Sequence, residues 1–331
     1  MLPKIGWVKI ASRRYGGTVY EDRAQKILAE NFDLETVEIN SRLFKRGYWR
    51  ILELLWQMFL LKGEKDVWIL DNKTVITLPF DKTKGKKIAI IHHVDFSRSK
   101  GLAKFIDFFI EKMLYWSLKK ADLIVTVSAF WQNHFRAKGY KNVAKIYNSF
   151  DTALFESLSR EEVENFKRKY HLEGKPIIYL GNCQKDKGVV ESYQALKDLD
   201  CHLVTSGERH VEIPALNLNL DYQGYLELLK ASSIVLFMSK LKEGWGRTAH
   251  EAMLLKTPVI GSGLGGTKEL LEGGKQIICS DHSSLKEKVL FLMNNPEERE
   301  KIGQDGYNFA KSFTHEKFQG QWLKLINNLN L

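Results

Sequence analysis

The chain has 331 residues, of which 44% are hydrophobic and 27% charged, and its formal net charge is +10. This composition is typical of a folded globular protein and excludes a disordered or fibrous chain, and the length is sufficient for two domains. No window offers about twenty uninterrupted apolar residues, so no membrane span is predicted. The start, MLPKIGWVKIAS, lacks a signal peptide's apolar core, and three scattered cysteines fit a reducing cytoplasm.

Short apolar runs alternate with longer helical patterns over the first 150 residues. Strands are predicted at KIGWVKIAS, LETVEIN, DVWILD, KIAIIHH and ADLIVTVS. Helices are predicted at GGTVYEDRAQKILAENF and GLAKFIDFFIEKMLYWSLKKA, where apolar residues recur every three or four positions. This βαβ alternation predicts a parallel sheet with helices on both faces.

The same alternation restarts after residue 155. Strands are predicted at IIYLGNC, CHLVTSG, SIVLFMS and TPVIGS, and helices at VVESYQALKDL, around GYLELLKAS and around AHEAMLLK. The last stretch, HEKFQGQWLKLINNL, reads as one amphipathic helix with no strand after it. We therefore predict an α/β protein with two Rossmann-like domains, residues 1–155 and 156–312, followed by a C-terminal helix within 313–331.

The hexapeptide GSGLGG, residues 261–266, matches the glycine pattern of dinucleotide-binding sites. It follows the β-branched run TPVI, and Asp281 lies 20 residues beyond Gly261, near where a ribose-binding acid would be expected. A dinucleotide site normally follows the first strand of its domain, whereas this turn follows the fourth predicted strand of the second domain. An NAD-dependent oxidoreductase is therefore an alternative rather than the favoured interpretation.

Two carboxylates, Glu243 and Glu251, lie just upstream of this turn in the segment EGWGRTAHEAM. The EGWG turn predicts that a helix begins near residues 246–248, and the open N–H groups of a helix start bind phosphate with help from the helix dipole. Glu251 would lie about one turn into the helix, where it can accept hydrogen bonds from a ribose diol. Glu243 would lie before the helix, where it can hold the hydroxyls of a sugar. The spacing therefore suits a nucleotide-sugar.

With its flanks, this segment resembles glycosyltransferase family 4, the glycosyl transferases group 1, which are retaining enzymes of the GT-B fold. EGWGRTAHEAM matches the family's pattern of two Glu separated by seven residues, and KTPVIGSGLGGTKEL matches its P-V-I strand and glycine turn. Further matching segments are RRYGGTVYE, IIHHVDF, YLGNCQKDKGV and LDYQGYLELLKAS. Their order and spacing over most of the chain carry the resemblance, because each motif alone is common.

The resemblance implies two domains that face each other across a cleft, with the C-terminal helix crossing back to the first domain. It implies retaining, metal-independent transfer of a hexose from a nucleoside-diphosphate sugar, UDP-sugar by default, to a glycan or lipid-linked acceptor. The nucleotide-sugar is a substrate, and no cofactor is expected. Asp198 and Asp200 spell the Asp-x-Asp of metal-dependent glycosyltransferases of another fold. They precede a predicted strand, at the wrong end of the sheet for a ligand.

The resemblance also assigns roles to single residues. Glu243 positions the sugar, and His92, with His93 as second choice, contacts the sugar or the acceptor. Cations and helix-start N–H groups stabilise the leaving diphosphate. The family carries Arg where this chain has Asn182, so Lys185 or Arg247 would have to compensate. The predicted donor-binding set is Gly16, Gly17, Asn182, Lys187, Tyr225, Glu243, Gly244, Trp245, Gly246, Arg247, Thr248 and Glu251, with Lys185, Gly265 and Gly266 as further candidates.

Positive charge is concentrated in the first half of the chain. Residues 1–150 contain 27 Lys and Arg against 15 Asp and Glu, so we expect an anionic partner there. The segments SRLFKRGYWRILELLWQMFLLKGEK and SKGLAKFIDFFIEKMLYWSLKK combine cations with aromatic residues at helical spacing. One alternative is that they are core helices with solvated charged faces. The other is that they lie on an anionic lipid surface, and we expect this second alternative for residues 44–61. We expect a cytoplasmic protein with a peripheral place on the membrane, and no nucleic-acid partner, because no recognition module appears.

Two further alternatives share the GT-B fold. The loss of the family's Arg at Asn182 leaves open a catalytically inactive protein that binds a sugar polymer or a lipid. A sugar phosphorylase would use the same cleft for a disaccharide and inorganic phosphate. The oxidoreductase alternative explains neither EGWGRTAHEAM nor Lys187.

Overall fold

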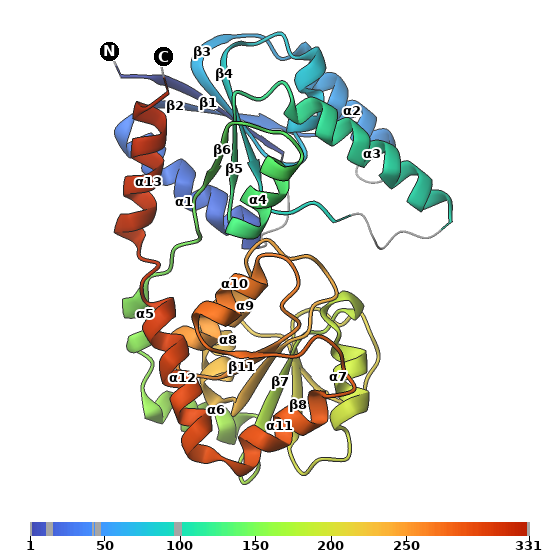
Figure 1. The fold of residues 1–331 in the computed structure, drawn as a ribbon, viewed down its shortest axis with the longest axis vertical. Helices are drawn as coiled ribbons and strands as arrows, with labels where there is room; N and C mark the ends of the chain where they lie inside the picture. The colour runs from blue at the N-terminus through green and yellow to red at the C-terminus, as the bar shows by residue number, and fades with distance from the viewer. Residues whose placement is uncertain (1, 11–15, 42, 44–47, 96–100, 330–331) are drawn as a thin grey trace. The chain divides into compact units, whose positions relative to one another are not determined.

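The computed structural model describes residues 2–10, 16–41, 43, 48–95 and 101–329, and it forms two compact units (Figure 1). The first unit contains Met1–Asn148 together with Glu316–Leu331, and the second contains Ser149–His315. The chain therefore passes from the first unit to the second shortly before residue 155, where the sequence placed the boundary, and its last helix belongs to the first unit.

A six-stranded parallel sheet forms the centre of the first unit, in the order β2-β1-β3-β4-β5-β6. Five of its strands lie where apolar runs predicted them, and β6 is a short addition that the sequence pattern did not indicate. The strands are β1 (Lys4–Ile10), β2 (Asp33–Ile39), β3 (Glu64–Leu70), β4 (Lys84–Ile91), β5 (Leu123–Thr126) and β6 (Val143–Lys145).

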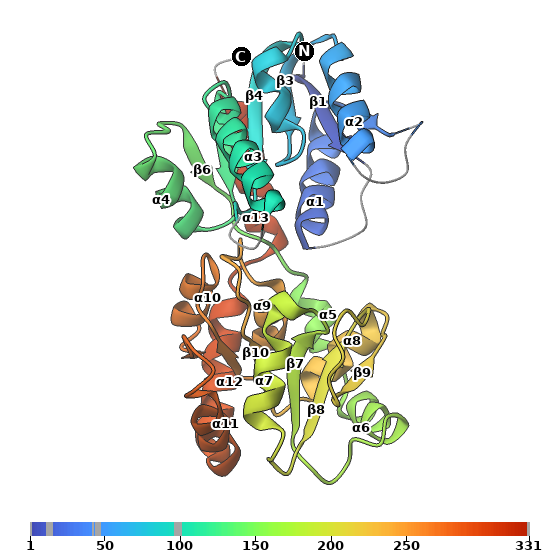
Figure 2. The ribbon, with the colours of Figure 1, turned by 90° about the vertical axis from the view of Figure 1, so that its right-hand side faces the viewer.

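Helices cover both faces of this sheet (Figures 1 and 2). Alternate residues of a strand point to opposite faces, so Val8 and Trp7 belong to different layers. Val8 packs in one core with Leu54, Met58 and Leu114 from the helices on its side. Those elements are α2 (Tyr48–Leu60), the 3₁₀ helix η1 (Val75–Phe80), α3 (Leu102–Leu118) and α4 (Ala129–Ala137).

The opposite face is covered by α1 (Gly16–Asn31) and the C-terminal helix α13 (His315–Asn327). Trp322 is fully buried, and its ring centroid lies 6.5 Å from that of Trp7 and 6.3 Å from that of Tyr20. Phe318 and Ile326, one helical turn to either side, are buried as well. This apolar stripe explains why the chain returns to the first unit.

The second unit has its own six-stranded parallel sheet, in the order β12-β11-β10-β7-β8-β9. Counted from β7, this is the 3-2-1-4-5-6 order of the Rossmann fold. The sequence pattern missed β9 and β12, so the glycine turn follows the fifth strand of this unit and not the fourth. The strands are β7 (Ile177–Asn182), β8 (His202–Ser206), β9 (Leu216–Leu218), β10 (Ile234–Phe237), β11 (Val259–Gly261) and β12 (Ile277–Ile278).

Helices again pack on both faces of the second sheet. Leu180 contributes to a core with α7 and α11, whereas the ring of Tyr179, on the other face, lies 6.2 Å from that of Tyr225 on α8. The elements are α5 (Thr152–Glu156), α6 (Arg160–Lys169), η2 (Lys185–Lys187), α7 (Val189–Leu196), α8 (Tyr222–Ala231), α9 (Arg247–Leu254), α10 (Thr267–Gly273), α11 (Leu285–Asn294) and α12 (Pro296–Ala310). The α/β prediction is therefore confirmed in both units.

Within the described ranges, no helix combines the length and the apolar content needed to cross a bilayer.

Candidate functional site

The predicted donor residues of the second unit gather where its strand order reverses. The sheet grows in opposite directions from the adjacent strands β7 and β10, and ligands of such sheets bind outside the carboxyl ends of the strands at that point. Asn182 ends β7, and Lys187 lies in the η2 turn after it. Glu243 follows β10, and α9 begins four residues later at Arg247. Segments distant in sequence thus meet at one edge of the sheet.

An ion pair joins the loops that follow β7 and β10. Lys187 Nζ lies 2.7 Å from Glu243 Oε1, and Ser239 Oγ donates to the same oxygen at 2.7 Å. The Glu243 side chain is only 13% exposed, so the pair is partly shielded from water. Ser239 was missed by the sequence analysis because nothing in its local pattern distinguishes it from an ordinary loop serine.

The glycine turn lies directly against the Glu243 backbone. Gly265 has φ +71°, and a Cβ there would come within 2.5 Å of the Glu243 carbonyl oxygen. The Gly266 N–H donates to that same carbonyl at 2.8 Å. The turn therefore holds the Glu243 loop in place, and the N–H of Gly266, a further donor-binding candidate, is already bonded within the protein. This close backbone approach is a structural reason for the glycine at position 265, and it does not require a bound dinucleotide.

The start of α9 presents backbone N–H groups at this edge. The helix begins at Arg247, within the predicted range of 246–248, after Gly246 with φ +99°. Gly246 has no side chain that could cap the first N–H groups of the helix. An anion is favoured at such a helix start by the N–H groups and by the helix dipole.

Glu251 is buried in the second turn of α9 and accepts several hydrogen bonds. Arg247 donates at 2.5 Å and Tyr222 at 3.1 Å to Oε1, and Tyr225 donates at 3.3 Å to Oε2. Burial alone would lower the pKa of Arg247, but the Glu251 charge beside it leaves that pKa raised. A carboxylate offers about four acceptor positions, so there is room for a ribose hydroxyl. Tyr222 was not identified from sequence.

Tyr225 also connects Glu251 to the start of the helix. Its hydroxyl oxygen also lies 2.9 Å from Thr248 Oγ1, within hydrogen-bond distance. Burial, followed by the charge of Glu251, raises the pKa of Tyr225 well above its ordinary value, so the hydroxyl keeps its proton. The predicted residues Tyr225, Thr248 and Glu251 therefore form one hydrogen-bonded group.

Asn182, which stands where the resembling family has Arg, is fixed by two hydroxyl groups. Tyr179 Oη donates to Asn182 Oδ1 at 3.0 Å, and Ser206 Oγ donates to it at 3.2 Å. These bonds orient the amide so that its NH₂ group is the donor left for a ligand. Asn182 is exposed at the end of β7, so a neutral donor occupies the position of the family's cation.

The Trp245 side chain is part of the core of the second unit and does not line the site. Its Nε1 donates to His250 Nδ1 at 3.0 Å, and His250 Nε2 donates to the Ala310 carbonyl at 3.1 Å. The His250 ring stacks on Phe150 with 3.9 Å between the centroids. Burial lowers the pKa of His250 to about 3, so the ring is neutral. Only the main chain of Trp245 can therefore serve a donor, and His250 was not recognised from sequence.

The first unit carries the remaining candidates. Gly16 and Gly17 are the first two residues of α1, and the preceding residues 11–15 lie outside the described part of the chain. His92 follows β4, and its Nε2 lies 2.9 Å from Oε1 of the buried Glu21. The second choice, His93, accepts a hydrogen bond from Asn72 on its carbonyl oxygen at 2.9 Å. Glu21 had no predicted role, although it lies in the quoted segment RRYGGTVYE.

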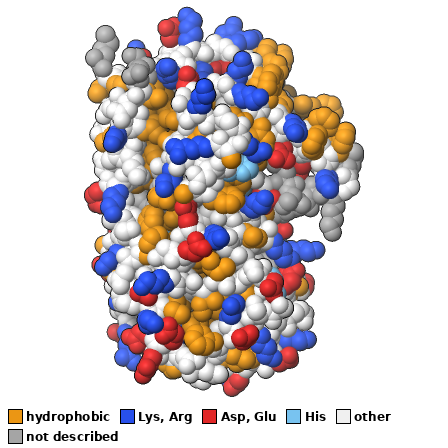
Figure 3. Space-filling view, in the orientation of Figure 1, with side chains coloured by type: hydrophobic (Ala, Val, Ile, Leu, Met, Phe, Trp, Pro, Cys, Tyr) orange, Lys and Arg blue, Asp and Glu red, His pale blue; other side chains and the backbone are white. Residues whose placement is uncertain are grey.

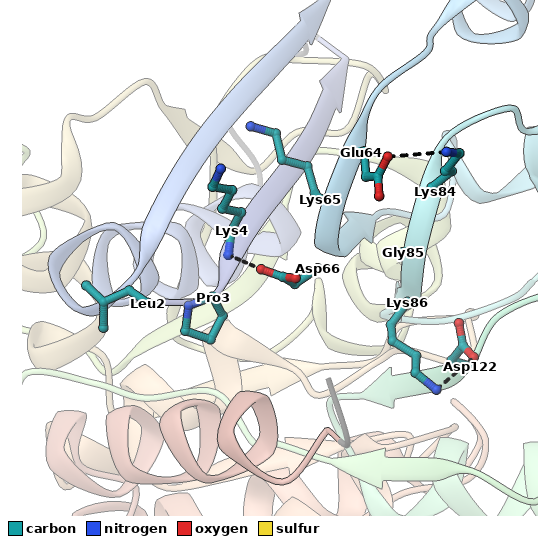
Figure 4. A pocket seen from close by; sticks show the side chains of 10 residues that line it. All are labelled: Leu2, Pro3, Lys4, Glu64, Lys65, Asp66, Lys84, Gly85, Lys86 and Asp122. Atoms are coloured by element: carbon teal, nitrogen blue, oxygen red, sulfur yellow. Dashed lines mark hydrogen bonds and ion pairs between the residues drawn. The ribbon is translucent and has the colours of Figure 1, made fainter.

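A separate pocket lies at the amino ends of β1, β3 and β4 (Figure 4). Its charges are largely paired with each other: Lys84 lies 3.3 Å from Glu64, and Lys86 lies 3.8 Å from Asp122. Ligands of parallel sheets bind at the opposite, carboxyl edge, so this pocket is not the candidate site. Among the described residues, no group of three or more His, Cys, Asp or Glu side chains is placed to hold a metal.

Solved structures share the architecture of both units. HepE of Anabaena, whose structure is described in complex with UDP-glucose, matches with a TM-score of 0.76 at 16% sequence identity, covering 99% of this chain and 100% of that chain. The protein thus has the GT-B fold of glycosyltransferases. Residues 159–309 match the model of the family Glycosyl transferases group 1. This range lies within the second unit.

Curated relatives agree with this assignment. An uncharacterized glycosyltransferase of Methanocaldococcus jannaschii is 27% identical over 217 residues, or 61% of this chain. The N-acetyl-alpha-D-glucosaminyl L-malate synthase of Bacillus anthracis is 23% identical over 236 residues, or 64% of this chain. The matched regions span 58% and 60% of the lengths of these two relatives.

The neutral state of His250 predicts how stability depends on pH. An unfolded histidine titrates near pH 6.5, whereas the folded His250 has a pKa of about 3. The unfolded chain therefore binds the proton more readily, and the folded state loses about 1.4 kcal/mol of stability for each pH unit below about 6.5. Denaturant titrations between pH 7.5 and 4.5 should show a shallower dependence in His250→Gln than in the wild type, whereas the control His202→Gln should retain the wild-type slope. Equal slopes in the wild type and His250→Gln would contradict a buried neutral ring.

Proposed function

We propose that the chain transfers a sugar from a nucleoside-diphosphate sugar, with UDP as the nucleotide, to an acceptor. The observation that carries this proposal is the meeting of Lys187, Glu243, Glu251 and the start of α9 at the strand reversal of the second unit. The group 1 family match of that unit supports the reaction class. The choice of UDP is supported by HepE, which has been solved with UDP-glucose.

The ion pair between Lys187 and Glu243 suggests how the site changes when the donor binds. A diphosphate carries more negative charge than one carboxylate, so it competes for the Lys187 cation. Once Lys187 contacts the diphosphate, the Glu243 carboxylate is free to accept hydrogen bonds from hydroxyls of the transferred sugar. The N–H groups of α9 bind the same diphosphate, and negative charge that develops on the leaving group is stabilised by both.

Glu251 binds the ribose in this proposal, and Arg247 takes part in binding the diphosphate. Arg247 lies in the first turn of α9, and its guanidinium carbon lies 5.1 Å from the centre of the Phe150 ring. It provides a cation close to the helix start, which compensates for the neutral Asn182. With Lys187, Arg247 and the helix N–H groups supplying positive charge, we propose that no metal is needed and that nucleotide-sugar is bound as a substrate without a cofactor.

The acceptor is assigned to the first unit, and it is a glycan or a lipid-linked molecule. His92 is the side chain proposed to contact the acceptor or the transferred sugar, with Glu21 orienting its ring through Nε2. The transferred group is a hexose in this proposal, and its anomeric configuration is retained. The first unit's positive charge suits an acceptor that carries phosphate.

Nucleotide binding tests the proposal directly. Calorimetric titrations with UDP, GDP, ADP and NAD, first with a chelator and then with Mg²⁺, should show binding of UDP that does not require the metal. NAD as the preferred ligand would contradict the proposal and favour an oxidoreductase. Binding of none of the four would favour a catalytically inactive protein, a candidate suggested by Asn182.

The two glutamates should differ in their effects. Glu251→Gln should weaken UDP binding at least about tenfold, because hydrogen bonds to a charged group contribute about 1.5–3 kcal/mol. Glu243→Gln should leave UDP affinity within a few-fold but slow UDP release from UDP-sugar by about 100-fold or more. Glu298→Gln, a change at a surface ion pair, is the matched control and should behave as the wild type. Wild-type turnover in Glu243→Gln would contradict the assigned role.

Restoring the family's cation should strengthen nucleotide binding. Asn182→Arg replaces a neutral donor with a charged one, which should raise UDP affinity about tenfold in calorimetry. Asn182→Gln lengthens the side chain without adding charge, so it should leave the affinity unchanged or lower it. An unchanged affinity in Asn182→Arg would mean that residue 182 does not reach the diphosphate.

A further inference from the structure

Two helices of the first unit expose large apolar side chains to solvent. On α2, Trp49 and Trp56 are 66% and 60% exposed, and on α3, Phe105 is 61% exposed. Hydrophobic side chains gather over these two helices in the space-filling view, at its upper right (Figure 3). We call this surface the aromatic face and define it as the exposed Trp49, Leu52, Trp56, Leu60, Phe80, Phe105, Phe108, Phe109 and Trp116 together with the half-buried Phe59.

Each of these helices is apolar on two sides. α2 buries Leu54 and Met58 in the core of the unit, whereas Leu52 and Trp56 point to solvent. α3 repeats the arrangement, because it buries Leu114 and exposes aromatic residues on its other side. A helix that is apolar on all sides is normally surrounded by protein or lipid. The core of the first unit covers one apolar side of each helix, and the other apolar side is exposed to solvent.

The exposed rings form groups along one surface. The 3₁₀ helix η1 packs against both α2 and α3. Its Phe80 contacts Trp116 of α3 edge to face, with 6.0 Å between the ring centroids. Phe105 and Phe109 are 4.7 Å apart farther along α3. Single exposed apolar residues are ordinary, but a contiguous surface of this kind marks an interaction site.

Lysines lie among and around these rings. Lys82 Nζ lies 3.8 Å from the centre of the Phe59 ring, and Lys112 Nζ lies 5.3 Å from that of Phe108. Lys62, Lys104, Lys119 and Lys120 are exposed on or next to the same helices. The acids of α3, Asp107 and Glu111, are half-buried. The surface is therefore apolar at its centre and basic around it.

We propose that the aromatic face docks on a bilayer that contains anionic phospholipids. Tryptophan and phenylalanine rings suit the boundary between headgroups and acyl chains, and lysines beside them reach the lipid phosphates. Stable attachment of a surface helix takes both apolar and electrostatic attraction, and this surface supplies both. Resting on the proposed function, this docking makes the acceptor a lipid-linked molecule that the first unit meets at the membrane.

Co-sedimentation of the full chain with vesicles tests the proposal. The chain should bind vesicles of phosphatidylcholine and phosphatidylglycerol in equal parts, bind phosphatidylcholine alone more weakly, and dissociate as salt is added. The double variant Leu52→Ser with Trp56→Ser should lower binding to the anionic vesicles at least about tenfold, because two apolar side chains no longer enter the bilayer. Leu216→Ser with Phe291→Ser removes two exposed apolar side chains from the second unit and is the matched control.

Three outcomes would overturn the proposal. The wild type could fail to bind anionic vesicles, or the test and control variants could lose vesicle binding equally. The third outcome is that the wild type binds no vesicles but self-associates, and the test variant does not self-associate. The last outcome would make the face an interface between copies of the chain. UDP binding measured on the same preparations separates this proposal from the proposed function, because the substituted side chains lie in the first unit. A test variant that binds UDP as the wild type does is folded, so its loss of vesicle binding supports the proposal.

Discussion

The candidate donor site depends on the close approach of glycine backbones to the loops that carry its charged side chains. A Cβ on Gly265 would clash with the Glu243 carbonyl, and a Cβ on Gly188 would come within 2.3 Å of the Met238 carbonyl. Both contacts involve the segment between β10 and α9, which therefore has little freedom to shift. The position of the Glu243 carboxylate, and with it the ion pair to Lys187, follows from these backbone contacts. The stacked His250 fixes the other end of the segment, because it holds Trp245 against the core.

Local patterns predicted the longer strands and several of the helices. Strands of four or more residues and helices of several turns carry enough alternating positions to show their period, and the start of α9 followed from its glycine turn. The strands β6, β9 and β12 have three residues or fewer, which is too short to show any period. The C-terminal helix was predicted to return to the first unit from a resemblance. The stripe of Phe318, Trp322 and Ile326 supplies the physical reason.

The candidate site was predictable only where a motif covers it. Glu243, Glu251 and Lys187 were predicted because several motifs in order along the chain resemble those of a family, and the structure places the three residues at one edge of the sheet. Ser239 and Tyr222 act through contacts with residues that no local pattern relates to them. For Trp245, the motif predicted a contact with the ligand that the side chain does not make. Its large apolar ring is buried in the core beside His250. Sequence spacing gives the position of a residue along a loop but not the direction of its side chain.

In the two proposals made here for anion binding, the two units differ in how they attract the anion. In the second unit, Lys187 and Arg247 each have a carboxylate partner. Partly buried charges without partners would be costly, and pairing avoids that cost while keeping the cations where a diphosphate can compete for them. This arrangement needs no excess of positive charge, and residues 151–331 contain 23 Lys and Arg against 25 Asp and Glu. A bilayer is an extended anionic surface with no fixed geometry, so it is bound by an excess of charge and apolar area over a whole face. The first unit has both of these properties, so the proposed docking would account for its basic composition and for its exposed aromatic helices together.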